Sequence, residues 1–267
     1  MPGVTTTVGG QWSIRARILP FVEQADLQNL INWNVNYATQ VNVAIKRIPI
    51  YLCPSEINDI VRVNPSTGVP RDYPSTYGFN FGTWKIYDPT NGTGGDGAFH
   101  PNSNYTTAAF RDGTSNTLCA AEVIAYTPYI RNTSSDPGAA PPSNPSFAAG
   151  LVGDGCCIGP SVQLNTGQTE WADGLCQQSG FTTTFRPNTK VSYVVGGATY
   201  DIDVVSWREV TTATRVTYAA LQSRSHHVGI VQVLLMDGAV RPVSDNINGQ
   251  VWRALGTRAG GEVFSDY

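Results

Sequence analysis

His227 and Asp237 are the residues of this chain best suited to metal binding or proton transfer. Nine residues separate them, and Gly238 follows Asp237. An imidazole beside a carboxylate could bind a metal ion or act as a general base. The alternative is structural: the imidazole bonds to backbone, and Asp237 is a turn residue that tolerates the left-handed conformation. His226 should point to the opposite side of an extended segment, so we do not expect the two histidines to share a ligand site.

The segment containing this pair is predicted to be a β-hairpin. An apolar run covers residues 230–236, an Asp-Gly pair follows, and a second short strand is expected over 239–243. The turn needs a positive φ, which glycine supplies without a Cβ clash.

Carboxylates are the second group of candidates. Glu122 lies within an apolar strand, and a buried carboxylate needs a partner, so we predict an ion pair with Arg15 or Arg17. A polysaccharide hydrolase would need two acids facing each other across a groove. The spacing does not show whether any of the four candidate acids converge: Asp112, Glu122, Asp173 and Asp237. The sequence has no nucleophile elbow, zincin helix motif or phosphate loop, which argues against an enzyme.

An oxygen-rich turn runs from Asp112 to Asn116, and Asp96 lies in a similar glycine-rich stretch. Short oxygen ligands of this kind suit Ca²⁺. The alternative is a turn that stabilises itself through Asx hydrogen bonds. Calcium is therefore one possible ligand, with Asp112, Asn116 and Asp96 as its candidate residues.

The chain has five cysteines, an odd number. We predict a disulfide from Cys156 or Cys157 to Cys176, which would contribute roughly 3 kcal/mol by constraining the unfolded chain. No Cys-x-x-Cys or paired-histidine spacing accompanies these thiols, so they do not form a zinc motif.

Composition restricts the class of protein. Charged residues make up 14% of the 267 residues, the net charge is −3, and no basic stripe is present, which argues against nucleic-acid binding. No run of 18 apolar residues predicts a membrane span, and the first residues lack the charged start and apolar core of a signal peptide. Few lysines and abundant Thr, Asn, Gly and aromatic residues favour an extracytoplasmic protein.

The predicted elements are helices first and strands afterwards, which favours a single α+β domain with N-terminal helices packed on a mostly antiparallel sheet. Residues 1–11 are expected to be a flexible lead-in. Long loops are expected at 56–75, 88–104 and 131–150, the last disordered or facing a partner. Helices are predicted at 13–19, 21–33 and 248–255, and strands at 48–55, 76–81, 117–126, 191–195 and 199–205.

Aromatic residues are about a tenth of the chain and could form a stacking surface for sugars. Most tyrosines and tryptophans in proteins are buried or half-buried, which is the alternative. The candidates are Trp33, Tyr37, Tyr73, Tyr77, Trp84 and Tyr87.

Several blocks spread over nearly the whole chain resemble one bacterial family, the prepilin-type processing-associated H-X9-DG proteins. This family is also catalogued as domain of unknown function 1559 and under a bacterial solute-binding label. The blocks are residues 12–24, Cys53-Pro54-Ser55, 111–118 with Glu122, 171–174, 180–185, 187–189, 227–238 and 252–263.

The resemblance implies a pilin-like globular head outside the cytoplasmic membrane, normally preceded by a leader and a long apolar helix that this sequence lacks. We therefore expect a non-enzymatic subunit of a filament, secretion pseudopilus or surface layer. Its partners would be like subunits, and it would reach the membrane only through the missing helix. The alternatives are a carbohydrate- or solute-binding module, which could depend on calcium, and the polysaccharide hydrolase considered above.

Overall fold

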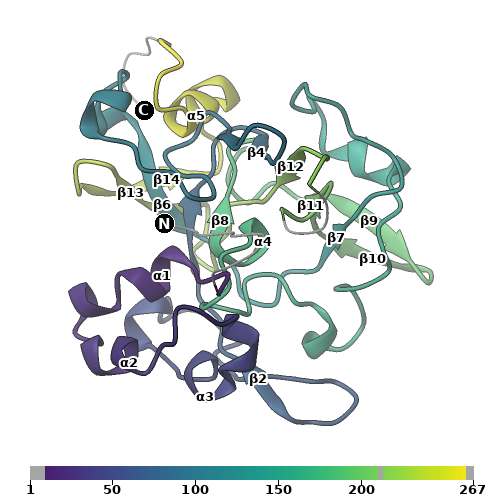
Figure 1. The fold of residues 1–267 in the computed structure, drawn as a ribbon. Helices are drawn as coiled ribbons and strands as arrows, with labels where there is room; N and C mark the ends of the chain where they lie inside the picture. Colours follow the sequence, from purple (N-terminus) through teal and green to yellow (C-terminus); the bar gives the residue numbers. More distant parts are fainter. Residues whose placement is uncertain (1–9, 210–212, 263–267) are drawn as a thin grey trace.

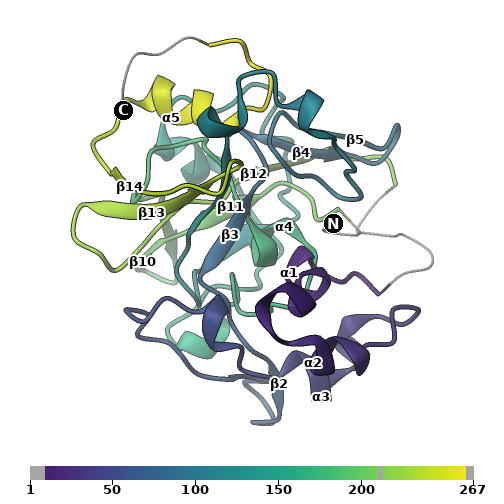
Figure 2. The ribbon, with the colours of Figure 1, turned by 90° about the vertical axis from the view of Figure 1, so that its left-hand side faces the viewer.

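The computed structural model describes residues 10–209 and 213–262 of the chain. It is an α+β fold with several short helices and mostly antiparallel sheets, as predicted. The helices of the first 50 residues gather at one end of the molecule, and the C-terminal helix lies at the opposite end (Figures 1 and 2). No helix in the described part of the chain is long and apolar enough to cross a membrane.

The N-terminal helices are shorter than predicted. Ser13 caps the first one by accepting a hydrogen bond from the Ala16 amide, but Pro20 and the left-handed conformation of Glu23 interrupt the pattern. The helical segments are α1 (Ile14–Arg17), η1 (Leu19–Val22), α2 (Ala25–Asn29), η2 (Tyr37–Thr39), α3 (Val41–Ala44) and η3 (Pro49–Tyr51). The predicted strand at 48–55 is wrong, because Pro49 begins the 3₁₀ turn η3 there.

The first five-stranded sheet has the order β14-β13-β6-β3-β8. Its strands are β3 (Tyr77–Asn80), β6 (Leu118–Glu122), β8 (Gly180–Phe181), β13 (Ile230–Leu235) and β14 (Val240–Ser244), and only the β3–β8 pair is parallel. The predicted hairpin at 230–243 is confirmed as β13 and β14. Along β13, Val231, Val233 and Leu235 are buried, whereas the alternate residues Gln232 and Leu234 face the other side.

Helix α5 (Gly249–Gly256) covers the buried face of this sheet. Asn248 caps it by accepting a hydrogen bond from the Gln250 amide, and Trp252 is fully buried with its ring 6.1 Å from that of Phe181. The predicted short helix at 248–255 is confirmed.

The second five-stranded sheet has the order β5-β4-β12-β11-β7. Its strands are β4 (Lys85–Asp88), β5 (Thr93–Gly94), β7 (Tyr129–Arg131), β11 (Asp203–Val205) and β12 (Thr217–Ala220). The 3₁₀ segment η6 (Pro145–Gly150) places the Phe147 ring 5.7 Å from that of Trp84. Part of segment 131–150 therefore packs on the protein, and its contact with a partner stays a prediction.

The remaining elements are short. Two small hairpins pair β1 (Arg62–Val63) with β2 (Pro70–Asp72) and β9 (Ser192–Val195) with β10 (Ala198–Asp201). The other segments are η4 (Thr107–Ala109), η5 (Thr114–Asn116), η7 (Val162–Leu164) and α4 (Cys176–Ser179). Residues 1–9 of the predicted lead-in lie outside the described residues.

Candidate functional site

The hairpin separates His227 from Asp237. His227 precedes β13 and Asp237 follows it, and six strand residues span about 20 Å. Asp237 is exposed, and its Oδ1 accepts a hydrogen bond from the Ala239 amide at 2.9 Å, while Gly238 takes a φ of +92°. Asp237 and Gly238 are therefore turn residues, and the pair does not form one site.

His227 instead meets Cys53 and Glu122, two residues from distant parts of the chain. Its Nε2 lies 3.5 Å from the Cys53 Sγ and 3.2 Å from the Glu122 Oε1, and all three atoms lie within 4.8 Å of one another. Cys53 comes just after η3, Glu122 ends β6, and His227 lies in the turn before β13. We call these three residues the Cys-Glu-His cluster.

Hydrogen bonds between the three residues and their surroundings fix the cluster. The second oxygen of Glu122, Oε2, accepts a hydrogen bond from the Gln232 amide of β13 at 2.7 Å. The Cys53 amide donates to the Thr76 Oγ1 at 2.6 Å, and the His227 amide donates to the Ser225 Oγ at 3.1 Å. The three side chains are thus held by two strands and two turns rather than by one mobile loop.

His226 engages a different carboxylate from His227, so the two histidines do not share one, although they lie in a bend and not in an extended segment. Its Nε2 lies 3.5 Å from the Glu56 Oε1. Glu56 is also held by the Asn58 and Ala125 amides, which donate to its two oxygens at 2.8 and 3.0 Å. The two histidines therefore belong to neighbouring but separate pairs.

The predicted ion pair between Glu122 and Arg15 or Arg17 is wrong. Arg15 is buried, and it donates to the backbone carbonyls of Gln178 and Tyr77 instead. Arg17 stacks its guanidinium over the Trp33 ring, 3.8 Å from the centroid. Because Glu122 is only 2% exposed, the imidazole of His227 is the group that meets this buried carboxylate.

The cluster is not arranged as a nucleophilic triad. In a triad, the nucleophile and the acid contact different nitrogens of the histidine, so that one orients the ring and the other loses its proton. Here Cys53 and Glu122 both face Nε2. Burial, with a contribution from Glu122, raises the pKa of the Cys53 thiol, which opposes formation of a nucleophilic thiolate.

An apolar groove of about 600 Å³ lies beside the cluster, between the N-terminal helices and the first sheet. Glu122 lines both the groove and the small cavity at the cluster. Ile50 and Val240 on the groove wall are 60% and 67% exposed. Its apolar wall consists mainly of Ile18, Val22, Ile50, Phe79, Leu234 and Val240.

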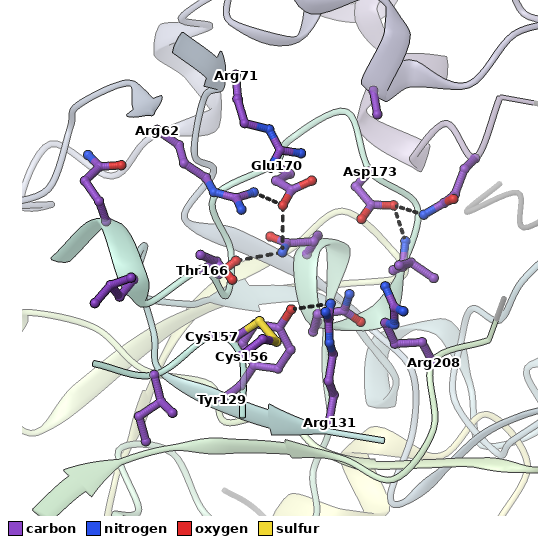
Figure 3. A pocket seen from close by; sticks show the side chains of 18 of the residues that line it. Arg62, Arg71, Tyr129, Arg131, Cys156, Cys157, Thr166, Glu170, Asp173 and Arg208 are labelled. Atoms are coloured by element: carbon purple, nitrogen blue, oxygen red, sulfur yellow. Dashed lines mark hydrogen bonds and ion pairs between the residues drawn. A yellow bond between two sulfur atoms is a disulfide. The ribbon is translucent and has the colours of Figure 1, made fainter. Parts of the chain in front are cut away.

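A second pocket, of about 560 Å³, is polar, and its lining includes Arg62 of β1, Arg71 of β2 and Arg131 of β7 (Figure 3). Arg62 forms ion pairs with Glu170 and, at 3.4 Å, with Asp72. Burial and the neighbouring Glu170 raise the pKa of Asp72 to about 7, and burial raises that of Asp173 well above its ordinary value. The pocket thus combines a buried cation with two carboxyl groups, those of Glu170 and Asp173, and burial favours the neutral form of Asp173.

Adjacent Cys156 and Cys157 form a disulfide that lines this polar pocket (Figure 3). Cys176 is a buried free thiol, and Cys53 and Cys119 are also free. The predicted bridge to Cys176 is therefore wrong. Burial in α4 directs Cys176 into the core formed with Phe81 and Tyr129, away from the loop that carries the pair.

The candidate calcium residues all have protein partners. The carboxylate of Asp112 accepts hydrogen bonds from the Gly260 and Gly261 amides at 2.7 and 2.9 Å. Asp96 accepts from the amide and the hydroxyl of Thr83. Asn116 donates to the Asp112 carbonyl at 2.9 Å. These contacts hold the C-terminal segment and one turn in place. Calcium binding stays a prediction.

The four acids considered for hydrolysis lie in different settings. Asp112 accepts hydrogen bonds from the C-terminal segment, and Glu122 belongs to the Cys-Glu-His cluster. Asp237 lies in the hairpin turn. Asp173 lines the polar pocket, where its Oδ1 accepts from the Gln11 amide group at 2.8 Å. No two of them line the same one of the pockets described here.

The proposed aromatic platform is also dispersed. Tyr37, Tyr73 and Trp84 are each at most 9% exposed, and they belong to two different core clusters. The six aromatic residues therefore do not form one exposed stacking surface.

Sequence reasoning missed Cys53 as a partner of His227 and missed Glu170 as the centre of the polar pocket. Cys53 carried a usable signal, since it lies in a Cys-Pro-Ser block of the family pattern. No motif or spacing in the sequence around Glu170 points to its place in the pocket.

The fold and these sites define an α+β protein that combines a polar pocket, an apolar groove and a Cys-Glu-His cluster. The chain belongs to DUF1559, a family of proteins of unknown function (SBP_bac_10), whose family model matches residues 2–250. Comparisons with curated proteins and with solved structures gave no match.

Proposed function

We propose that this protein is a non-enzymatic, pilin-like structural subunit that works outside the cytoplasm. The single observation that carries the proposal is the apolar groove between the N-terminal helices and the first sheet. Its occupant would be an apolar helix of the pilin type, through which like subunits assemble into a filament or surface layer and reach the membrane.

Burial of the exposed apolar side chains of the groove would stabilise a bound helix. Ile50 and Val240 are more than half exposed on its wall. Covering a side chain of this kind completely contributes roughly 1.5–3 kcal/mol, so the exposed part of each contributes somewhat less. A helix that covers both, together with Leu234 and Val22, would be held by several kcal/mol before its own ordering cost is counted.

The disulfide between Cys156 and Cys157 supports the extracytoplasmic part of the proposal, because disulfides persist in oxidising compartments. The loops at 56–75, 88–104 and 131–150 would face partners in the assembly. The Cys-Glu-His cluster supports a non-enzymatic role, since its geometry lacks a triad relay.

Paired substitutions of exposed valines test the proposal. Val240 lies on the groove wall and is 67% exposed, while Val194 on β9 is 65% exposed and does not line the groove. Cells would produce the subunit with a pilin leader and its peptidase, and electron microscopy with immunogold labelling would count surface assemblies. We expect Val240→Asp to abolish assemblies and Val194→Asp to leave them unchanged. Circular dichroism would check that both variants fold. Unassembled monomers for the unsubstituted subunit, or equal effects of the two variants, would refute the proposal.

A second candidate function, binding of a small polar solute or sugar, is favoured by one observation. The polar pocket of about 560 Å³ brings Arg62, Glu170 and Asp173 together, and the disulfide is part of its lining. Pockets with a few converging polar groups and perturbed pKa values are common binding sites. A glycan array and a thermal-shift screen with and without EDTA would test this function. A screen in which no sugar, small solute or chelator shifts the melting temperature would count against it.

A further inference from the structure

We infer that Cys53, Glu122 and His227 form a binding site for one Zn²⁺ ion. The site is independent of the proposed assembly function. Cys, His and Glu supply the sulfur, nitrogen and oxygen atoms that zinc binds, and borderline-soft divalent ions accept such mixed sets.

The distances match a tetrahedral zinc site. With zinc–sulfur bonds of about 2.3 Å and zinc–nitrogen and zinc–oxygen bonds of about 2.0–2.2 Å, the tetrahedron edges are about 3.5 Å from S to N and about 3.4 Å from N to O. The structure has 3.5 Å between the Cys53 Sγ and the His227 Nε2, and 3.2 Å between that nitrogen and the Glu122 Oε1. The third pair of atoms is within 4.8 Å. Two of the three edges thus match a zinc tetrahedron, with the Nε2 of His227 at their common corner.

Charge also fits a divalent ion. A Cys53 thiolate and the Glu122 carboxylate carry two negative charges, which balance Zn²⁺ when His227 is neutral. Glu122 is 2% exposed, and no arginine or lysine among the described residues lies within ion-pair distance of it, although a buried carboxylate requires compensation. A zinc ion would compensate the charge of this carboxylate more completely than an imidazole does.

The surroundings are those of a prepared metal site. The Gln232 amide orients the Glu122 carboxylate from behind by binding its other oxygen, as outer-shell partners of metal ligands do. Cys53 and Glu122 also line a cavity of about 10 Å³, close to the volume needed for about one water molecule. His227 has a side chain 35% exposed, so an ion can enter from solvent.

Three protein ligands leave one position of the tetrahedron open. Among the described residues, no fourth Cys, His, Asp or Glu joins the set. Water from the adjacent cavity or from solvent would complete the coordination, which is the arrangement of zinc sites that exchange their fourth ligand.

Cobalt and zinc titrations of the folded protein test the site. The Cys156→Ser/Cys157→Ser variant is the background, so that thiolates from a reduced pair cannot contribute under reducing conditions. We expect one equivalent of Co²⁺ to give a thiolate-to-cobalt charge-transfer band in the near ultraviolet, and one equivalent of Zn²⁺ to remove that band.

Matched variants assign the ligands. Adding Cys53→Ala or His227→Ala should abolish the band or lower the affinity by more than the roughly 10–100-fold typical of outer-shell changes. Cys119→Ala, which removes another free half-buried thiol, and His226→Ala, which removes the neighbouring imidazole, should leave both band and stoichiometry intact. Absence of the band in the background protein, or its persistence after Cys53→Ala, would overturn the inference. Glu122→Gln should weaken zinc binding, and equal affinity for that variant would remove Glu122 from the site.

Discussion

Replacement of Asp72 by Asn should flatten the pH dependence of stability. Asp72 is 2% exposed, and its pKa is raised from 3.8 to about 7, first by burial and then by Glu170. Arg62 at 3.4 Å and Arg71 at 3.9 Å oppose this rise, but they do not outweigh burial. The neutral carboxyl is therefore the form that the fold favours.

The sign follows from proton binding. Between about pH 4 and pH 7 the native protein keeps a proton on Asp72 that the unfolded chain has released, so the free energy of unfolding falls as pH rises. The contribution is complete below the unfolded pKa and is lost as pH rises through about 7. One pKa unit corresponds to about 1.4 kcal/mol, so the change from 3.8 to about 7 amounts to something on the order of 4 kcal/mol.

Urea denaturation followed by tryptophan fluorescence, at about pH 4 and about pH 8, measures this contribution. The Asp72→Asn variant has no titratable group at this position, so its free energy of unfolding lacks this pH dependence. From the acidic to the alkaline condition, the unsubstituted protein should therefore lose a few kcal/mol more of its free energy of unfolding than the variant does. Asp59→Asn is the matched control: Arg47 lowers the pKa of Asp59 from 3.8, so its small contribution is lost only below that pH, and its profile should stay parallel to that of the unsubstituted protein. Parallel pH profiles for Asp72→Asn and the unsubstituted protein would refute the argument.

Two further substitutions test the core and the disulfide. Trp252→Ala should lower the free energy of unfolding by about 3–5 kcal/mol, because the ring is fully buried against Phe181, whereas Val228→Ala at a 99% exposed position should change it by less than about 0.5 kcal/mol in the same urea titration. Replacing Cys156 and Cys157 with serine should lower the melting temperature only slightly in calorimetry, because a bridge between adjacent residues closes almost no loop and removes little entropy from the unfolded chain.

Sequence patterns correctly predicted the elements that depend on interactions between residues close together in the chain. The Asp-Gly turn between apolar runs predicted the hairpin of β13 and β14, and the helical pattern at 248–255 predicted α5. The predicted helix at 21–33 is too long, since its apolar spacing continues across Glu23, where the backbone takes a left-handed conformation. Three strand pairings in the two five-stranded sheets, β13 with β6, β3 with β8 and β12 with β4, join segments more than 100 residues apart and have no local signal.

The candidate site could be predicted only in part, for the same reason. His227 and Glu122 attracted attention because a histidine beside a hairpin and an acid in an apolar strand are both unusual. Their meeting with each other, and with Cys53 at a separation of 174 residues, depends on long-range strand pairing. Arg15 looked like a partner for Glu122 by charge alone, whereas the fold uses its guanidinium to satisfy two buried carbonyls.

The nine-residue spacing between His227 and Asp237 is explained by the hairpin rather than by contact between the two. One strand fills the interval, and the Asp-Gly turn fixes where that strand ends. The register of β13 on β6 pairs Val233 with Ala121, which places the Gln232 amide on the Glu122 carboxylate. A slip of one residue would turn every β13 side chain to the opposite face and break this contact. The turn at one end of the strand therefore holds the register that brings His227, at the other end, to Glu122 and Cys53.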